Sequence, residues 1–305
     1  MIVKTNRLSH VILPGIKGEC RFNYNIAHLT WFKVGGAVDI FYKPEDEDDL
    51  SSFLQQNQRL NLPVTTIGAG SNIIIRDGGI EGVLIKLGRN FTNIELNQDK
   101  ELVVGAGCLN FSLAKFCQEN GIKGFEFLVG IPGTIGGGIA MNAGAYGKEF
   151  KDIVLRVEAL DKEGRIKFFS NKEIGFLHRS NSLPADLIYT KVIFKTEAGD
   201  KSKITELMNE INNRRGVTQP VKEKTGGSTF VNPEGIKAWQ LIDQAGMRGK
   251  KLGGAMISEL HCNFMINTGN ALAAELEDLG ELVRQEVQKT SGYELKWEVK
   301  RIGRR

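Results

Sequence analysis

The distribution of glycine constrains this chain more than any other feature of its sequence. The 305 residues include 36 glycines, about 12%, whereas globular proteins average near 7%. Glycine inside a helix or strand is destabilising, so this content is expected only where the backbone takes a positive φ or approaches another group closely. The largest clusters lie at residues 68–70, 105–107 and 130–147, beside short apolar runs. We therefore predict loops that contact another backbone or a ligand.

Apolar runs of strand and helix length separate these clusters. Runs bounded by turn residues predict strands, here at residues 38–42, 64–67, 73–75, 83–87, 102–104, 153–161, 166–170, 189–196 and 294–302. Helices are expected at 44–57, which opens with acidic residues, and at 110–120, which stops before a glycine. Apolar side chains recur at helical spacing within 204–211 and 272–287, so the chain beyond residue 200 is expected to be rich in helix.

The length predicts about two folding units, at roughly 150 residues per domain. Apolar residues make up 41% of the chain and charged residues 25%, which is typical of a globular protein and not of a disordered one. The charged, apolar-poor residues 197–203 mark the expected boundary between a glycine-rich first part and a second unit. The final segment, 294–302, is expected to return as a strand to either unit.

Charge and cysteine patterns exclude several classes of partner. The net charge is +4 and basic residues are scattered, apart from 214–224 and 300–305, which favours small anionic ligands over nucleic acid. The cysteines form no CxxC pair and the histidines no HxxxH, so we expect no metal site and a reducing, cytoplasmic compartment. No run approaches the ~18 apolar residues of a membrane span, so neither membrane insertion nor secretion is expected.

A short loop between two predicted strands has the composition of a phosphate-binding nest. Its residues are Gly68, Ala69, Gly70, Ser71 and Asn72. Successive backbone N–H groups in such a loop can turn inward around a diphosphate, and the serine and asparagine add donors. The loop lacks the Lys-Ser/Thr of a Walker motif and the last glycine of GxGxxG, which weighs against ATP hydrolysis and ordinary dinucleotide binding. A tight turn without a ligand stays open as the alternative.

Two further segments carry candidate chemistry. Residues 124–147 interleave glycines with apolar side chains, which indicates a surface pressed against a large flat ligand, although a buried packing element is the alternative. Ser228 follows two glycines, near Lys222 and Lys224, so its hydroxyl could donate a proton or bind phosphate. No GxSxG motif surrounds it, so a hydrolase nucleophile is a weak interpretation, and a structural role for the lone serine stays open.

Taken in order, these segments resemble one protein family, the UDP-N-acetylenolpyruvoylglucosamine reductases (MurB). The resemblance rests on TWFKVGGAVDIF from Thr30, IGAGSNIIIRDGG from Ile67, VGAG from Val104, GIPGTIGGGIAMNAGAYG from Gly130, HRSNS from His178, GGSTFVNP from Gly226 and LKWEVKRIG from Leu295. It spans about residues 20–303, and the glycine, proline and asparagine placements of the Gly130 segment are its most specific part.

The resemblance implies an α+β protein with the vanillyl-alcohol-oxidase-like (PCMH-type) FAD-binding fold, in which two α+β subdomains hold FAD and a C-terminal α+β domain binds substrate. The implied units are 1–82, 83–199 (together an FAD-binding unit over about 30–199), 200–292 and a terminal strand at 293–305. The implied activity is an FAD-dependent, NADPH-using reduction of UDP-N-acetyl-3-O-(1-carboxyvinyl)-glucosamine to UDP-N-acetylmuramate for peptidoglycan synthesis. The expected partners are this UDP-sugar and NADPH, with no protein partner.

Site residues follow from matching the motifs position by position. Noncovalent FAD is expected to contact Gly68, Ala69, Gly70, Ser71, Asn72, Gly130, Ile131, Pro132, Gly133, Gly136, Gly137, Asn142, Gly144 and Ala145. The substrate is expected to contact Arg214, Lys222, Lys224 and Asn232. The resemblance assigns the catalytic step to Arg179, Ser228 and Glu298.

Elementary chemistry supports these three residue types. Hydride arriving at the vinyl carbon leaves negative charge on the neighbouring carbon and the substrate carboxylate, and that charge needs fixed donors. Arg179 can clamp the carboxylate with two hydrogen bonds. Ser228 can protonate the carbanionic carbon as a general acid. Glu298, if burial keeps it protonated, can donate to the same oxygens, and without the resemblance it would be read as a surface glutamate.

The chain departs from the family pattern at three positions. His178 stands where tyrosine is common, Val231 where lysine is frequent, and Lys300 where arginine is common. The interval between Arg179 and Ser228 is too short for the inserted tyrosine loop of some members, which indicates the short form. None of these changes removes a catalytic group. They are expected to affect substrate affinity and the closure of the site over the substrate.

Two other functions remain as alternatives. A flavin oxidase of the same fold often tethers FAD through histidine or cysteine, and neither residue type occurs in 68–72 or 130–147. A nucleotide-binding regulatory module would give Arg179, Ser228 and Glu298 no joint role and would carry no flavin colour.

Overall fold

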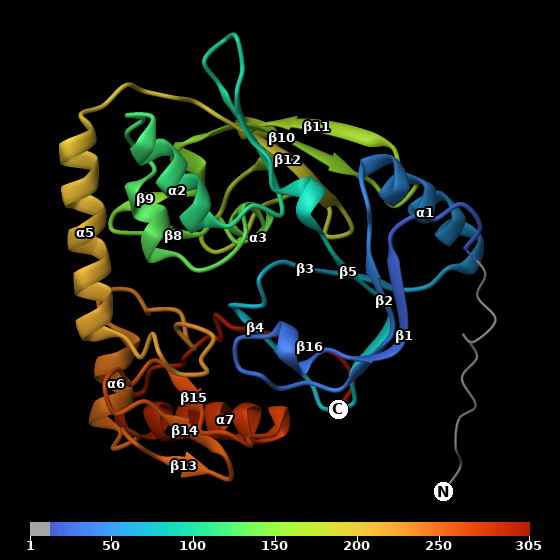
Figure 1. The fold of residues 1–305 in the computed structure, drawn as a ribbon. Coiled ribbons are helices and arrows are strands. Elements are labelled where there is room, and N and C mark those ends of the chain that lie inside the picture. The colour runs from blue at the N-terminus through green and yellow to red at the C-terminus, as the bar shows by residue number, and fades with distance from the viewer. Residues whose placement is uncertain (1–12) are drawn as a thin grey trace, which may run out of the picture.

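The structure is a computed structural model that describes residues 13–305 (Figure 1). Its first sheet has the strand order β1-β2-β5-β3. β1 (Glu19–Asn25) is antiparallel to β2 (Ala37–Lys43), whereas β5 (Ile80–Lys86) is parallel to both β2 and β3 (Val64–Ile67). Parallel strands need a crossover, and α1 (Glu47–Leu60) supplies it between β2 and β3.

The second sheet is antiparallel and has the order β11-β10-β12-β7-β6. Its strands are β6 (Ile94–Leu96), β7 (Leu102–Gly105), β10 (Val154–Leu160), β11 (Ile166–Ser170) and β12 (Ile188–Phe194). Shorter elements complete this region, namely the helices α2 (Asn110–Glu119), α3 (Ile135–Ala140) and α4 (Asn171–Ile174), the 3-10 helices η3 (Glu126–Gly130) and η4 (Phe150–Asp152), and the hairpin of β8 (Gly144–Ala145) and β9 (Lys148–Glu149). The 3-10 helix η1 (Ala27–Leu29) connects β1 with β2 of the first sheet, and η2 (Arg89–Phe91) connects the two sheets.

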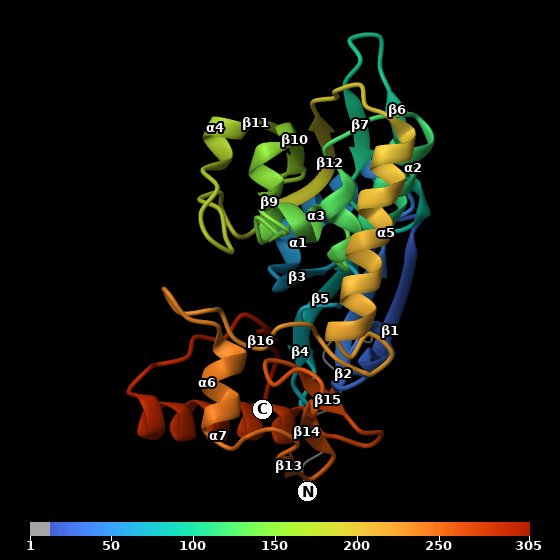
Figure 2. The same cartoon turned by 90° about the vertical axis from the view of Figure 1, so that its left-hand side faces the viewer.

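The helix α5 (Lys201–Thr218) packs on this second sheet region. Its buried side chains Ile204, Met208 and Ile211 belong to the same hydrophobic core as strand β7 and helix α2. Figure 2 shows α5 running from the side of β6 and α2 down towards β15. The helix that we expected to open the substrate domain therefore packs on the FAD-binding side, and we propose that the domain boundary lies after α5 and not at residue 200.

The C-terminal unit has its own core. A small sheet of β13 (Lys251–Leu252), β14 (Ala255–Ile257) and β15 (Met265–Asn267) packs with α6 (Ala238–Gln244) and α7 (Ala273–Ser291). Phe32, Val34 and Ile74 from the first part of the chain join this core, so the two units share one hydrophobic cluster.

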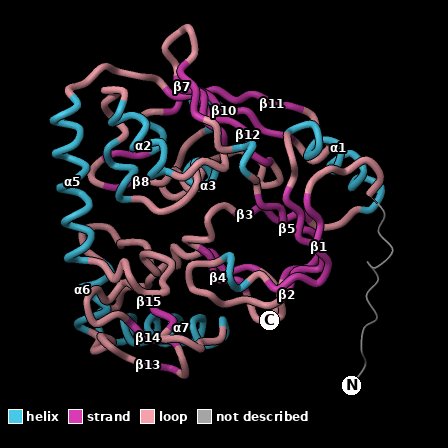
Figure 3. Tube along the Cα trace, in the orientation of Figure 1, coloured by secondary structure: helices cyan, strands magenta, loops and turns pink. Residues whose placement is uncertain are grey.

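The last strand returns to the first part of the molecule. β16 (Lys300–Ile302) pairs in parallel with β4 (Ile73–Ile75), and Figure 1 labels the two strands next to each other. The tube in Figure 3 marks the position of β4 in the same orientation. The expectation of one continuous strand over 294–302 was wrong, because residues 293–299 make single bridges and loop contacts in place of a ladder. This irregular path brings Glu298 between the two units.

The remaining strand and helix predictions are confirmed apart from boundary differences of a few residues. The sequence analysis missed the strands β1, β6, β8, β9, β13, β14 and β15, and it did not specify the helices α3, α4 and α6. Within residues 13–305 the four cysteines are free, no helix is long and apolar enough to cross a membrane, and no cluster of His, Cys, Asp and Glu could hold a metal ion.

Candidate active site

Two adjoining cavities form one groove between the glycine-rich loops. The larger has a volume of about 970 Å³ and extends along β3 and the 86–89 segment, and the smaller has about 440 Å³. They share residues 66–69, Thr134, Gly137 and Ala140 as lining. Arg179, Ser228 and Glu298 all line the smaller cavity and none of them lines the larger. The chemistry expected from these side chains therefore belongs at the smaller end.

The loop of residues 68–72 is held tightly against its neighbours. Gly70 has φ +67°, and a Cβ there would lie 2.1 Å from the carbonyl oxygen of Leu29, so only glycine fits. The Ser71 hydroxyl donates to the carbonyl of Pro132 at 2.9 Å, and the Asn72 amide donates to the carbonyl of Glu298 at 3.2 Å. Both side chains therefore tie loops together, whereas we had expected them to be donors to a phosphate.

The Gly130 segment divides between the groove and the core. Gly133, at φ +147°, and Gly137 line the smaller cavity, and the helix α3 starts there with Thr134 as its N-cap. Gly138 also lines this cavity, and in addition it packs on Phe150, where an added Cβ would lie 2.1 Å from the ring. Residues of this segment thus both line the cavity and pack in the core, so each of the two interpretations of its glycines describes part of it.

Most predicted cofactor residues line the smaller cavity. They are Gly68, Ala69, Gly70, Ser71, Asn72, Gly130, Ile131, Pro132, Gly133, Gly137, Gly144 and Ala145. Gly136 lines the larger cavity. Asn142 lies behind the wall, buried at φ +38°, and its amide donates to Glu149 and to the carbonyl of Leu177. The structure therefore gives Asn142 the role of holding the loop, since asparagine tolerates a left-handed backbone.

Arg179 and Glu298 meet across the smaller cavity. Arg179 Nε lies 2.8 Å from Glu298 Oε1, and Arg179 Nη1 lies 3.4 Å from the carbonyl oxygen of Gly144. The Nε–H is nevertheless buried without an aligned acceptor, so the contact is an ion pair and not a well-formed hydrogen bond. Arg179 also has φ +56°, which is uncommon for a residue other than glycine. The site holds this guanidinium with its hydrogen-bonding capacity partly unused.

Burial dominates the electrostatics of Glu298. It raises the pKa of this carboxyl above the ordinary glutamate value, although Arg179 and His178 oppose the shift. The carboxyl is therefore poised to be protonated more readily than a surface glutamate.

Backbone hydrogen bonds place Ser228 beside Glu298. Thr229 N donates to the carbonyl of Asn263 at 2.7 Å, and Glu298 N donates to the carbonyl of Thr229 at 2.8 Å. Gly227, at φ +77°, has no neighbour within 4 Å of a would-be Cβ, so it leaves the approach to the Ser228 hydroxyl open. The backbone of Glu298 is thus bonded directly to Thr229, the residue that follows Ser228.

The predicted substrate contacts lie away from the groove wall. Arg214, Lys222 and Lys224 are exposed and line neither cavity. Asn232 is also exposed, and its side chain accepts from Ala238 N at the start of α6.

Arg215 lines the smaller cavity where Arg214 was expected, and burial lowers its pKa. Helix phase could have found it, because Arg215 is four residues beyond buried Ile211 on the same face of α5. Of the family departures, His178 is exposed, Val231 is half-buried, and Lys300 lines the smaller cavity.

The groove fits a large polar and aromatic cofactor such as FAD. Four buried side-chain polar atoms of the described residues lack a hydrogen-bond partner, and three of them, Asn110 Oδ1, Arg179 Nε and Thr225 Oγ1, belong to residues that line the smaller cavity. Buried polar groups normally have partners, so these atoms indicate a missing ligand. Glycines on the same wall, such as Gly133, leave bare backbone for close approach.

Comparison with known proteins agrees with this site. Residues 219–302 match a family model described as UDP-N-acetylenolpyruvoylglucosamine reductase, C-terminal domain, and residues 38–170 match one described as FAD binding domain. The chain is similar to curated UDP-N-acetylenolpyruvoylglucosamine reductases of Rickettsia bellii (strain RML369-C) and Rickettsia akari (strain Hartford). The first is 65% identical over 292 residues, covering 96% of each chain, and the second is 65% identical over 294 residues, covering 96% of this chain and 99% of the relative. The solved UDP-N-acetylenolpyruvylglucosamine reductase (MurB) of Thermus caldophilus superposes with a TM-score of 0.81 at 31% identity, over 94% of this chain and 99% of that one.

Proposed function

The chain belongs to the UDP-N-acetylenolpyruvoylglucosamine reductase family, an FAD-dependent oxidoreductase with a PCMH-type FAD-binding fold, and on this premise we propose its cofactor choice and the roles of its residues. The electron donor is NADPH, and the product is UDP-N-acetylmuramate. The observation that supports this proposal is that Arg179, Ser228 and Glu298 all line the smaller cavity, together with residues of the two glycine-rich loops. FAD bound in the groove supplies hydride chemistry that none of these side chains can provide.

Arg179 binds the carboxylate of the enolpyruvyl group. Its guanidinium already faces a carboxyl in the cavity and keeps an unaligned N–H, so a substrate carboxylate can take up donors that the protein leaves free. As negative charge develops on the substrate, this fixed cation stabilises it without reorganisation.

Ser228 delivers the proton to the substrate carbon. Ser228 lines the cavity on a loop that Asn263 and Glu298 hold by backbone hydrogen bonds to the neighbouring Thr229. Glu298, whose pKa burial raises, donates a hydrogen bond in its protonated form to the same substrate oxygens that Arg179 binds. Arg215, a half-buried cation on the cavity wall, binds a diphosphate of the UDP-sugar or of NADPH.

Stopped-flow spectroscopy of the purified protein tests the function. The protein should carry noncovalent FAD that denaturation releases, because the flavin loops contain no histidine or cysteine to form a tether. Anaerobic NADPH should bleach the flavin faster than NADH does, and the enolpyruvyl UDP-sugar should restore the colour. A protein that binds no added FAD, or whose reduced flavin the UDP-sugar does not reoxidise, would refute the proposal.

Ser228→Ala separates the two halves of the reaction. Flavin reduction by NADPH requires no proton on a substrate carbon, so that step should stay near the wild-type rate. Reoxidation by the UDP-sugar should slow by about 10² to 10⁴, the usual contribution of a positioned general acid. Ser228→Cys, which keeps a donor, should lose less, and exposed Ser202 offers a matched control as Ser202→Ala. Equal slowing of both steps would make Ser228 a structural residue.

A further inference from the structure

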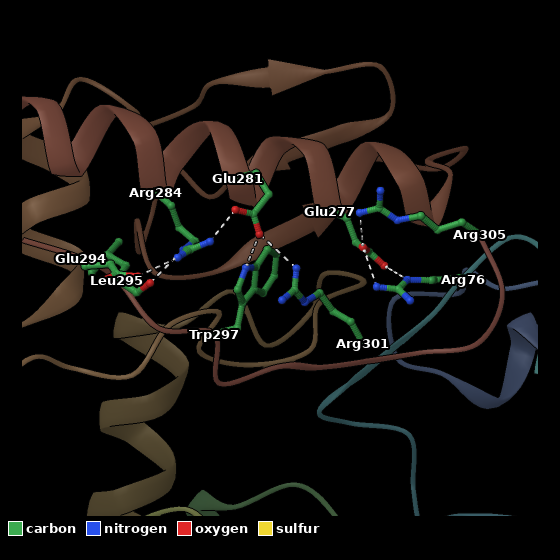
Figure 4. A network of polar contacts seen from close by, with 9 residues as sticks. All are labelled: Arg76, Glu277, Glu281, Arg284, Glu294, Leu295, Trp297, Arg301 and Arg305. Carbon is green, nitrogen blue, oxygen red and sulfur yellow. Dashed lines mark hydrogen bonds and ion pairs between the residues drawn. The ribbon is translucent and has the colours of Figure 1, made fainter.

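The acidic face of α7 holds the terminal segment that carries Glu298. Figure 4 shows Glu277 and Glu281 of this helix reaching arginines and a tryptophan of the last residues of the chain. Glu281 Oε1 accepts from Trp297 Nε1 at 2.8 Å and lies 3.0 Å from Arg301 Nη1. These two residues flank Glu298 in the sequence, on opposite sides. Glu281 therefore fixes the segment at both ends of the residue proposed to act in catalysis.

The indole of Trp297 sits in a fitted socket. Gly280 lies under the ring, where an added Cβ would be 2.1 Å from Trp297 Cη2, so a larger residue at this helix position would displace the indole. Phe230 packs on the ring at 5.1 Å between centroids, and the Arg301 guanidinium lies 4.3 Å over it. The socket thus combines a helix glycine, a carboxylate acceptor, an aromatic neighbour and a cation.

Adjacent side chains in an extended segment point to opposite faces. Trp297 points to α7, whereas Glu298 points to the cavity and Arg179. On the cavity side, backbone bonds to Thr229 and the Asn72 amide fix the position of the segment. The side chain of Trp297 opposes rotation of the segment about its own axis. This rotation decides where the Glu298 carboxyl points.

We propose that Trp297 is a positioning residue for Glu298 and that Gly280 and Glu281 form the socket through which it acts. The proposal rests on the role given above to Glu298. Loss of the anchor lets the segment rotate and admits water to the carboxyl, so Glu298 titrates nearer to the ordinary glutamate range.

Trp297→Phe removes the indole N–H while keeping an aromatic ring, and it should affect only the second half-reaction. Reoxidation by the UDP-sugar should slow by roughly 10- to 100-fold, as expected for a small displacement of a reacting group. Flavin reduction by NADPH should be unchanged. Because the protonated form of Glu298 is the active one, the rate should begin to fall at a lower pH than in the wild type. Backbone amides of residues 298–300 should exchange hydrogen faster, a readout that needs no turnover.

Two conservative variants and one control sharpen this test. Glu281→Gln keeps an oxygen that can accept from the indole, so it should retain more activity than Glu281→Ala. Gly280→Ala, which crowds the indole, should reproduce the pH shift of Trp297→Phe. Trp239 is an exposed tryptophan of α6 in the same unit, and Trp239→Phe should match the wild type in all readouts.

Combining Trp297→Phe with Glu298→Gln identifies the residue through which the tryptophan acts. If Trp297 acts through Glu298, its effect on reoxidation should largely disappear in the Glu298→Gln background. A full, additive effect there, an unchanged pH profile, or equal slowing of both half-reactions would overturn the positioning role. A wild-type protein that the UDP-sugar does not reoxidise would instead refute the proposed function.

Discussion

Two arginine–glutamate pairs join distant parts of this chain, and they differ in how completely their hydrogen bonds are used. Arg76 reaches Glu277 with two bonds, Nε to Oε1 at 2.7 Å and Nη2 to Oε2 at 3.2 Å, and its Nη1 donates to the carbonyl of Gly303. Arg179 instead meets Glu298 at 2.8 Å without an aligned Nε–H, on a backbone with positive φ. The first pair is satisfied by the protein alone, and the second is not.

We infer that the Arg76–Glu277 pair contributes to stability and that the Arg179–Glu298 pair contributes to ligand binding. A bidentate pair around a glutamate side chain that is only 4% exposed fixes the end of β4 relative to α7, because removal of Arg76 leaves the buried Glu277 with only the more distant Arg305 as a cation partner. A pair with unused donors gains partners only when a ligand arrives, so its contribution appears in the bound state. We therefore expect loss of the arginine to lower stability in the first pair and to slow the reaction in the second.

Arg179→Met should give the largest effect, and it should be kinetic. Loss of a fixed donor to developing negative charge slows a reaction by about 10² to 10³, so reoxidation by the UDP-sugar should slow to this extent in stopped-flow measurements. The melting temperature should stay near that of the wild type, because the lost contact is not an aligned hydrogen bond. Arg179→Lys keeps the charge but loses the planar fork, so its reoxidation rate should lie between those of the wild type and Arg179→Met. A large loss of stability with normal reoxidation would contradict this assignment.

Arg76→Met should show the opposite pattern. The free energy of unfolding, from urea titrations, should fall by about 3 kcal/mol, at the lower end of the range for breaking a buried pair because Arg76 is partly exposed. Both half-reactions of the folded protein should keep their rates. Lys289, an exposed lysine of α7 that lies 3.9 Å from Glu286, gives the control Lys289→Met, which should leave stability unchanged. Slow reoxidation at full stability would place Arg76 in the site.

The smallest expected effect is on the pH dependence of stability, and Glu298→Gln tests it. A carboxyl whose pKa is raised by folding stabilises the protein at acid pH, and this contribution is lost as the pH rises through the raised pKa. The unfolding free energy of the wild type minus that of Glu298→Gln should thus decline as the pH rises above about 4.3, the ordinary glutamate value. Each tenfold change in proton affinity is worth about 1.4 kcal/mol. A difference that is constant with pH would refute the raised pKa.

The elements of this fold could largely be predicted from local sequence. Apolar runs between glycine clusters predicted strands such as β3 and β4, and acidic residues marked the start of α1, because strand length and helix capping are local properties. The strands of the small C-terminal sheet were missed because they are two or three residues long, too short for any periodicity to be recognised. The irregular path of 293–299 was missed because its bonds go to other loops.

The candidate site was less accessible to sequence reasoning. Asn72 and the carbonyl of Glu298 are 226 residues apart in the chain yet hydrogen-bonded, and no local pattern joins them. The motif resemblance supplied that link, and the catalytic roles of Arg179, Ser228 and Glu298 remain predictions. Arg215, and not the predicted Arg214, lines the smaller cavity, and its spacing from Ile211 on α5 could have indicated this.

The parallel pairing of β4 with β16 also has a consequence for biosynthesis. Ile73 cannot pair until Lys300, roughly 227 residues later in the chain, has been synthesised. At ribosomal rates of about 5 to 20 residues per second, this takes roughly 11 to 45 s. During that interval β4 has no strand partner among the described residues, and pairing over such a separation closes slowly. The flavin loops and the Ser228 loop therefore emerge before the segment that brings Glu298, so a nascent chain can begin to enclose its cofactor while one wall of the cleft is still being synthesised.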